Sequence, residues 1–373
     1  MKIIIIAPLS AIALRTRLSK IASILVERDF EVFFIGWERS SGELNKYATK
    51  GVTEWPLLRG GGYSSRRARA LYPVWMLLVF FWVLVRGRNK TLYCLGWETA
   101  FPAKVASYLS GSKVVFDDAD RFSMLVQFPL KIGAVVRMLE RWTSRSSFLH
   151  IVPSFSRYEW RFDNMIEIKN TPLRGKWSVS EGQAGSKPSR PLILYVNGWV
   201  GQTRGAPIFL ELMSRLNARG VGVLMHVAGR VDCPSGRQLI ALPNVKYHGL
   251  LTQDEALELY GESDLVLTYY DPAVEINRLA ESNKWGDCVF TGVPFVVNSE
   301  VLTARKFLDA GAAFAFPYVD HAALLRFIEE QVEDRSRIVQ ARKSIFLLKD
   351  QAFDFESQFG TVIARVTQGM GKR

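Results

Sequence analysis

Cysteine and histidine are scarce in this sequence. Its 373 residues include 3 cysteines and 4 histidines, and Cys94, Cys233 and Cys288 show no CxxC spacing. Such spacing marks many structural zinc sites, and small secreted proteins depend on paired cysteines. The composition therefore indicates a reducing compartment, and we expect neither a metal ion nor any other cofactor.

Motifs of two large classes of nucleotide-binding protein are also missing. The turn after the first predicted strand, Pro8-Leu9-Ser10-Ala11, lacks the glycines of a dinucleotide fingerprint, so an NAD-type domain has no support. No nucleic-acid motif accompanies the formal net charge of +12, and we expect no nucleic-acid partner. A basic excess of this kind favours an anionic membrane surface or a phosphate-bearing substrate.

The sequence has no hydrophobic run of the roughly 20 residues that span a bilayer. The run 72–85 is too short, and it lies between Arg66, Arg67 and Arg69 on one side and Arg86 and Arg88 on the other. It is either a helix buried against a sheet or a helix that dips into lipid headgroups while the arginines meet phosphates. The apolar start of the chain resembles a secretory signal, but a proline splits it and the following pattern needs it as a strand.

Strands and helices alternate along the whole chain. With 48% hydrophobic and 23% charged residues, the sequence reads as globular and is long enough for two domains. Predicted strands are 2–7, 30–36, 91–95, 113–116, 148–152, 166–172, 192–196, 222–228, 246–247, 264–268 and 294–297; predicted helices are 17–28, 72–85, 99–110, 131–145, 207–219, 254–260, 320–333 and 335–366. This order predicts an α/β fold with doubly wound parallel sheets.

The stretch 268–297 carries the polar residues that organise the predicted site. It begins at a strand end, and its helix is expected to start near Asn283. Asn277, Asn283 and Lys284 fall on the loop and the first helical turn, where free N–H groups and the helix dipole favour an anion. Asp287 lies one turn later on the same face and could accept hydrogen bonds from hydroxyl groups. The plain alternative is a helix N-terminus with ordinary solvated charges.

Other strand ends of the second half carry glycines and basic residues. Gly198 would let the backbone approach a diphosphate, and Arg204, followed by Gly205, can bind phosphate oxygens bidentately. Arg230 and His248 fall at the next strand ends. Taken singly, Arg204 could be a solvated loop residue and His248 a structural turn residue.

The pattern N-x5-NK-x2-D-x4-G-x-P-x-V, carried by residues 277–296, resembles the donor-binding segment of GT-B glycosyltransferases. The nearest group is the family 4 type that builds bacterial surface polysaccharides. There the residue at Asp287 is usually Glu and holds the ribose of a nucleotide-sugar. A second acidic residue of that family is replaced by Leu279, with Glu275 and Glu281 as displaced candidates.

This resemblance implies two facing Rossmann-like domains and a C-terminal helix that crosses back to the first one. We expect an acceptor-binding domain at 1–174 and a linker at 175–190, which is rich in Gly, Ser, Lys and Pro. A nucleotide-sugar-binding domain would follow at 191–345, and the returning helix at 346–373. The base of the nucleotide would lie near Arg230 and His248.

Carboxylates at strand ends of the first half are the candidate catalytic residues. The turn Asp117-Asp118-Ala119-Asp120 resembles an aspartate–x–His–Glu sequence of the family, with Ala119 at the histidine position. We expect Asp120 to be the general base, with Asp118 and Glu98 as the next candidates. Asp118-x-Asp120 also matches the metal-binding D-x-D of the other large glycosyltransferase fold, but so short a pattern recurs by chance.

The resulting hypothesis is a metal-independent, hexosyltransferase-like enzyme. It would move sugar from a nucleoside-diphosphate sugar to a saccharide or polyprenyl-linked acceptor in surface polysaccharide biosynthesis. Its expected location is cytoplasmic, peripherally attached to the anionic inner face of the cell membrane. The alternatives are a sugar-nucleotide epimerase of the same fold and a non-catalytic sugar- or lipid-binding scaffold, which the missing histidines would suit.

Overall fold

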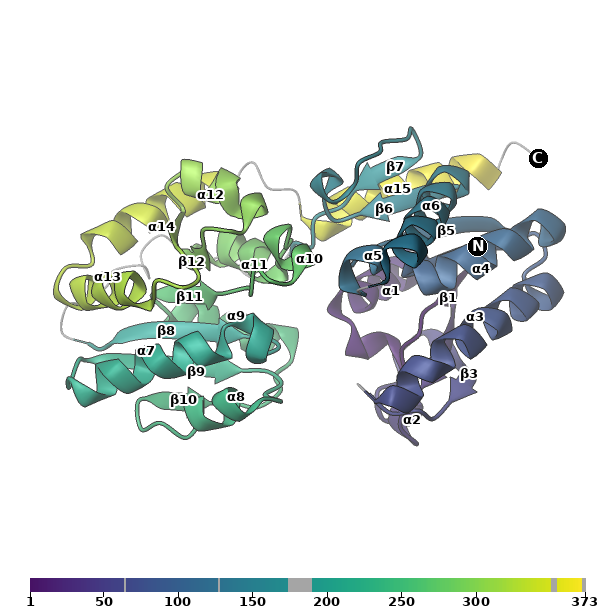
Figure 1. The fold of residues 1–373 in the computed structure, drawn as a ribbon. Helices are drawn as coiled ribbons and strands as arrows, with labels where there is room; N and C mark the ends of the chain where they lie inside the picture. The colour runs from purple at the N-terminus through teal and green to yellow at the C-terminus, as the bar shows by residue number, and fades with distance from the viewer. Residues whose placement is uncertain (64, 127, 174–189, 350–353, 371–373) are drawn as a thin grey trace. The chain divides into compact units, whose positions relative to one another are not determined.

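The computed structural model describes residues 1–63, 65–126, 128–173, 190–349 and 354–370, and the predicted linker falls almost wholly outside them. The chain divides into two compact units (Figure 1). Unit 1 contains Met1–Lys169 and Phe355–Arg373, and unit 2 contains Asn170–Asp354. Each unit is a parallel sheet covered by helices on both faces.

Unit 1 is built on a seven-stranded sheet in the order β3-β2-β1-β4-β5-β6-β7. Its strands are β1 (Lys2–Ile6), β2 (Glu31–Glu38), β3 (Val52–Arg59), β4 (Thr91–Leu95), β5 (Lys113–Asp117), β6 (Leu149–Val152) and β7 (Met165–Glu167). The apolar start of the chain is thus an inner strand, paired in parallel with β2 and β4. Because both of its faces are covered, it reads as an unbroken apolar run.

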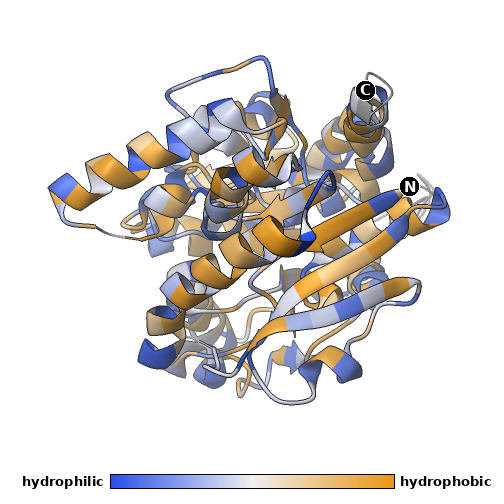
Figure 2. Ribbon diagram, turned by 90° about the vertical axis from the view of Figure 1, so that its right-hand side faces the viewer, coloured by the Kyte–Doolittle hydropathy of each residue, from blue (hydrophilic) through white to orange (hydrophobic). Residues whose placement is uncertain are grey.

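The helices of unit 1 form two layers. They are α1 (Thr16–Glu27), α2 (Glu43–Lys46), α3 (Arg66–Arg86), α4 (Trp97–Ser110), α5 (Phe122–Leu125), α6 (Leu130–Ser146) and α15 (Phe355–Met370). Ile4 and Ile6 of β1 pack in one cluster with residues of α3, α4 and α6, so these three helices share one face of the sheet. Figure 2 shows hydrophobic residues along most of α3, which is longer than the predicted helix 72–85.

The C-terminal helix α15 belongs to unit 1. The backbone N–H of Lys169 donates to Oε1 of Gln358 at 2.7 Å, and Arg365 donates to the carbonyl of Asp163 at 3.3 Å. Phe359 packs edge-on against the buried Tyr93 of β4. The predicted helical region 335–366 is in fact two helices, and only the second returns to the first unit, as the resemblance implied.

Unit 2 has a six-stranded parallel sheet in the order β10-β9-β8-β11-β12-β13. The strands are β8 (Leu192–Asn197), β9 (Val223–Ala228), β10 (Val245–Tyr247), β11 (Leu265–Thr268), β12 (Phe295–Asn298) and β13 (Ala313–Phe316). The helices are α7 (Ala206–Ala218), α8 (Pro234–Leu239), α9 (Gln253–Glu262), α10 (Glu275–Arg278), α11 (Asn283–Thr291), α12 (Arg305–Asp309), α13 (His321–Glu333) and α14 (Ser336–Lys349). The alternation of strand and helix in both units confirms the predicted fold class.

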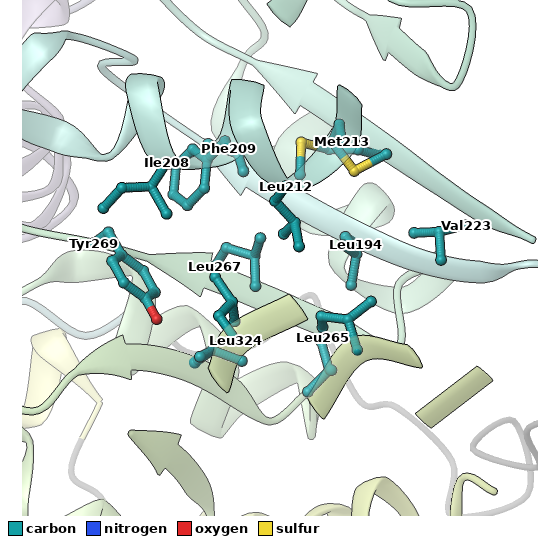
Figure 3. Packing of buried hydrophobic residues seen from close by; sticks show 14 of the residues in the cluster. Leu194, Ile208, Phe209, Leu212, Met213, Val223, Leu265, Leu267, Tyr269 and Leu324 are labelled. Carbon is teal, nitrogen blue, oxygen red and sulfur yellow. The ribbon is translucent and has the colours of Figure 1, made fainter. Parts of the chain in front are cut away.

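The core of unit 2 holds its strand ends in fixed positions. Leu212 and Met213 of α7 pack with Leu194, Leu265 and Leu267 of the central strands (Figure 3). A second cluster on the other face centres on Trp285 of α11, which stacks on a phenylalanine of β12 at 5.6 Å between ring centroids. Since α11 and the β11 loop are anchored in this way, the polar residues between them are positioned by buried side chains.

Candidate functional site

Two cations of unit 2 lie against one tyrosine ring. The guanidinium carbon of Arg204 is 4.9 Å from the centroid of Tyr270, and Nζ of Lys284 is 5.8 Å from the same centroid. Both side chains are half-buried, and among the described residues neither forms an ion pair with a carboxylate. Two adjacent half-buried cations without a carboxylate partner are suited to binding an anion with more than one negative charge.

Glycines shape the loop that carries Arg204. Gly205 has a φ of +84° at the start of α7, and a Cβ there would lie 2.6 Å from the Phe209 ring. The loop is tied to the end of β11 by a hydrogen bond from Asp271 N to Thr203 O at 3.1 Å. Nearby, a Cβ on Gly198 would approach Cε of Lys284 to 3.6 Å, so the predicted glycine turn and the predicted lysine are neighbours.

A close backbone approach occurs where β8 and β9 end. Gly229 has a φ of +120°, and a Cβ on it would lie 2.0 Å from the carbonyl oxygen of Gly198. Its N–H donates to the carbonyl of Gly249 at 2.6 Å. Only glycine fits this position, because any side chain would push the Gly198 loop away from Lys284.

We expect Gly229→Ala to unfold unit 2 more easily and to weaken anion binding. The clash and the positive φ together should lower the free energy of unfolding by about 2–4 kcal/mol. Gly249→Ala is the matched control, since its φ is +72° and no atom lies within 4 Å of the added Cβ. Urea denaturation should show a loss of about 1–2 kcal/mol for the control. Equal losses in the two variants would contradict the steric argument.

Helix α11 begins at Asn283, as the sequence predicts, and its first N–H groups receive no side-chain cap. The hydroxyl of the N-cap residue Ser282 instead accepts a hydrogen bond from the Tyr270 hydroxyl at 2.6 Å. Trp285 fixes the helix by donating from Nε1 to Thr268 Oγ1 at 3.1 Å. The positive end of the helix dipole therefore adds to the charge of Lys284 on the first turn.

Two other predicted binding residues are held inside unit 2. Asp287 is buried and accepts hydrogen bonds from Gln253 Nε2 at 3.3 Å and from the Tyr260 hydroxyl at 3.5 Å. Asn277 is also buried, and its side-chain amide donates to the carbonyl of Asp271 at 2.9 Å. The hydrogen bond from Asn277 therefore holds the loop after β11 in place.

Arg230 and His248 lie at the ends of β9 and β10. Arg230 pairs with Asp232 at 2.8 Å, and Asp232 also accepts from Trp199 Nε1 at 2.8 Å. The rings of His248 and His226 are 4.9 Å apart, and partial burial lowers the pKa of each imidazole below its usual value. Both histidines are therefore neutral near pH 7 and present aromatic surfaces at this edge.

In unit 1, the first two aspartates of the acidic turn are buried and bonded to other side chains of the interior. Asp117 forms a buried ion pair with Arg17 at 2.8 Å and accepts from the Tyr93 hydroxyl at 2.5 Å. Asp118 is buried and accepts from the Tyr158 hydroxyl at 2.6 Å. Burial, with Glu140 nearby, raises the pKa of Asp118 well above its usual range, because both disfavour the charged carboxylate.

Asp120 is half-buried and already paired. Its carboxylate is 2.8 Å from Arg15 and 3.7 Å from Arg157. The two guanidinium groups occupy both oxygens of this carboxylate, so an acceptor hydroxyl would have to compete with them for the same atoms. The side chains of Asp118 and Asp120 are thus directed to different partners, and no group of three or more potential metal ligands occurs within the described residues.

Glu98 has the properties that a general base requires. It lies in the first turn of α4, after the carboxyl end of β4 and two residues after the N-cap Gly96, whose φ is +78°. Burial raises the pKa of Glu98 to about 7, although Arg39, Arg15 and its own backbone N–H act in the opposite direction. A carboxyl that titrates near neutral pH can accept a proton from a hydroxyl group and release it again.

A polar cluster near the same sheet edge was not predicted. Oγ of Ser10 is 2.5 Å from the Glu43 carboxylate, which also accepts from the Tyr63 hydroxyl at 2.7 Å. Arg39, buried beside them, donates to the Tyr72 hydroxyl at 3.0 Å. The sequence signal for this cluster is the run of three glycines at 60–62, which precedes Tyr63. In the structure all three glycines have a positive φ.

Comparisons with known proteins agree on the fold. No protein-family model matches the sequence, and a search of curated proteins finds no match. Sucrose-phosphate synthase from Thermosynechococcus elongatus superimposes with a TM-score of 0.71 at 11% identity, over 100% of both chains. HepE from Anabaena in complex with UDP and glucose gives 0.69 at 13% identity, over 99% of this chain and 100% of the other.

A third structure extends the same comparison to another reaction. A putative UDP-N-acetylglucosamine 2-epimerase from Listeria monocytogenes gives a TM-score of 0.63 at 10% identity, over 99% of this chain and 96% of the other. Such low identities establish architecture and leave activity to the site residues. With two Rossmann-like units on parallel sheets, matched over its full length, this chain has the GT-B fold.

Proposed function

We propose that the protein is a glycosyltransferase that takes a hexose from a nucleoside-diphosphate sugar and attaches it to a lipid-linked or saccharide hydroxyl. The observation that carries this proposal is the pair Arg204 and Lys284, half-buried, directed at one tyrosine ring and unpaired with carboxylates among the described residues. A diphosphate is the anion that suits two such cations beside an uncapped helix N-terminus. The match to a UDP-bound structure supports the same donor class.

The proposed reaction needs two cations at the leaving group and one carboxylate at the acceptor. The acceptor oxygen bonds to the anomeric carbon while the bond from that carbon to the β-phosphate oxygen breaks. Negative charge grows on the diphosphate, where Arg204 and Lys284 stabilise it. The acceptor proton passes to Glu98, which we place ahead of Asp120 as the base. The positive charge at the diphosphate comes from side chains and a helix terminus, so the proposal is metal-independent.

Thermal shift against UDP-, GDP- and TDP-sugars tests the donor class. A ligand at a hundred times its dissociation constant should stabilise the protein by about 2.7 kcal/mol, which corresponds to a rise of a few degrees in Tm. One nucleotide series should stand out, and its free diphosphate should stabilise the protein too, since the cations contact that part. No stabilisation by any of the three series at saturating concentration would contradict the proposal.

An epimerase of the same fold is the competing enzyme. It would convert the sugar of the nucleotide without an acceptor. Incubation of the bound nucleotide-sugar with the protein alone, followed by NMR of the sugar, separates the two. An unchanged sugar without acceptor, and transfer once a polyprenyl-linked or oligosaccharide acceptor is added, is the expected result.

A further inference from the structure

Three helices form the outer layer on one face of the unit 1 sheet. Trp75, Val79 and Val83 of α3 lie in the core with alanines of α4 and with Val136 of α6. Trp75 also donates from Nε1 to Thr99 Oγ1 of α4 at 3.1 Å. The inner side of this layer is therefore covered by the sheet, and only its outer side is free to meet a partner.

The outer side of α3, α4 and α6 is unusually apolar. More than half of the large exposed hydrophobic residues in the described part of the chain lie on the segment 74–138. Each helix contributes at least two of them: Leu77 and Phe81, Tyr108 and Leu109, Leu130 and Met138, with 57–90% of each side chain exposed. Helix α4 packs against both α3 and α6, and exposed apolar side chains gathered on neighbouring helices mark an interaction site. We call this surface the apolar layer.

Charge on the apolar layer has one sign. The acidic residues within α3, α4 and α6 are Glu98, which is partly buried at the sheet edge, and Glu140, which is buried against Arg121 at 3.5 Å. Exposed cations surround the apolar side chains: Arg66, Arg67, Arg69 and Arg86 on α3, and Lys131, Arg137, Arg141 and Arg145 on α6. Within the described residues none of these cations pairs with a carboxylate.

We propose that the apolar layer docks on the surface of an anionic lipid bilayer. Apolar side chains of this kind enter the headgroup boundary, and each nearby cation adds about 1 kcal/mol at an anionic leaflet. A second copy of the chain fits poorly, because the layer offers no exposed carboxylate to the arginines of the other copy. The charge pattern therefore selects lipid phosphates as the partner.

The helix α3 lies on the membrane in this proposal and does not cross it. By length and composition it could span a bilayer, and it is the one described helix that could. Its inner side, however, holds Trp75, Val79 and Val83 in the core, and extraction would expose the sheet beneath them. Trp75 therefore stays in the core, whereas Phe81 is exposed and available to enter the lipid.

The position of the layer gives it a role in the proposed reaction. The Tyr72 hydroxyl of α3 accepts from Arg39, which lies beside the polar cluster at the carboxyl edge of the sheet. This part of the inference rests on the proposed function: a docked layer would keep unit 1 beside a lipid-linked acceptor. Docking itself is independent of transfer and can be measured without any substrate.

Vesicle flotation of the whole protein tests the docking. Binding is expected to vesicles of phosphatidylcholine with phosphatidylglycerol at low salt, and to fall in high salt because screening weakens the arginine contacts. Combined Arg66→Gln, Arg67→Gln and Arg69→Gln should weaken binding at least tenfold. The control replaces Arg237, Arg326 and Lys343, three exposed cations of unit 2, and should bind as the wild-type protein does.

A second set of variants tests the apolar contribution. Phe81→Ser, Leu109→Ser and Leu130→Ser together should abolish flotation, whereas Leu250→Ser, Leu302→Ser and Leu347→Ser, at similarly exposed positions in unit 2, should not. Nucleotide binding and Tm, measured on the same proteins, separate loss of docking from loss of fold or donor binding. The proposal would be overturned by no binding to anionic vesicles, or by equal binding to vesicles of phosphatidylcholine alone. It would also be overturned if the protein stayed on the vesicles after alkaline carbonate extraction, or if it formed a dimer without lipid that the variants of the apolar layer dissociate.

Discussion

Lys284→Ala and Arg204→Ala should each lower kcat/KM roughly a hundredfold while the protein stays folded. Each change removes a cation from the proposed diphosphate site beside Tyr270. A charge-assisted contact contributes roughly 1.5–3 kcal/mol, and the loss is larger in a transition state in which the diphosphate gains charge. Initial rates with the nucleotide-sugar identified by thermal shift measure the effect, and far-UV circular dichroism checks the fold.

Arg237→Ala is the matched control for both changes. Arg237 is an exposed cation of the same unit, on α8, and its removal should leave kcat/KM within a factor of two. Arg204→Lys adds a test of geometry, because lysine keeps the charge but loses the planar pair of N–H donors. We expect it to recover only part of the activity. Normal activity in both alanine variants would remove the basis of the proposed donor site.

The double variant shows whether the two cations act on one group. If both contact the same diphosphate, the effects of Arg204→Ala and Lys284→Ala should be non-additive, since loss of one already misplaces the ligand. Additive losses would mean that the cations contact separate parts of the substrate. The measurement is a double-mutant cycle on kcat/KM and on the dissociation constant of the nucleoside diphosphate.

The parts of the fold that were predictable have strong local signals. β1 and β11 are apolar runs covered on both faces, and α11 begins at Asn283, where the polar pattern changes period. β3 was missed because it is an edge strand with Pro56 inside it and Trp55 exposed, so it lacks the buried pattern of its neighbours. β13 was missed for a similar reason, since it is a four-residue strand at the edge of the other sheet and is mostly half-buried.

The candidate site was predictable in type but not in detail. Lys284 lies on the first turn of α11 and Arg204 in the loop between β8 and α7, and the two cations lie against the same tyrosine ring. The state of the acidic turn could not be read from sequence, because the partner of Asp117 is Arg17, 100 residues earlier, and that of Asp118 is Tyr158. Burial and distant partners decide which carboxylates are available, and no local pattern encodes either.

Glu98→Gln should abolish transfer, whereas Asp120→Asn should leave a substantial part of it. Glu98 has the pKa of about 7 and no ion pair among the described residues, whereas Asp120 is held by Arg15 and Arg157. Loss of a general base costs roughly 10²–10⁴-fold. In the unchanged protein, kcat/KM should rise with pH through about 7 as Glu98 loses its proton, and Glu98→Gln should remove this rise.

Stability should change in the opposite direction to activity. Burial raises the pKa of Glu98 from 4.5 to about 7, so between these values the folded protein holds a proton that the unfolded chain has lost. The stability this proton represents is fully present below pH 4.5 and is lost as pH rises through 7, at most about 3 kcal/mol. Above pH 7, Glu98→Gln should therefore have a higher Tm than the unchanged protein, and near pH 4 an equal one.

The combination separates a catalytic carboxylate from a structural one. Neutralising an ion-paired residue such as Asp120 should lower the stability of the protein. Neutralising Glu98 should raise it above pH 7, because burial disfavours the charged form of Glu98. A Glu98→Gln protein that is more stable at pH 8, still binds the nucleotide-sugar and transfers nothing is the expected result. If that protein keeps its turnover, or if Asp120→Asn is the variant that loses it, Asp120 returns as the base. Should both variants bind donor and transfer at normal rates, neither carboxylate takes the acceptor proton.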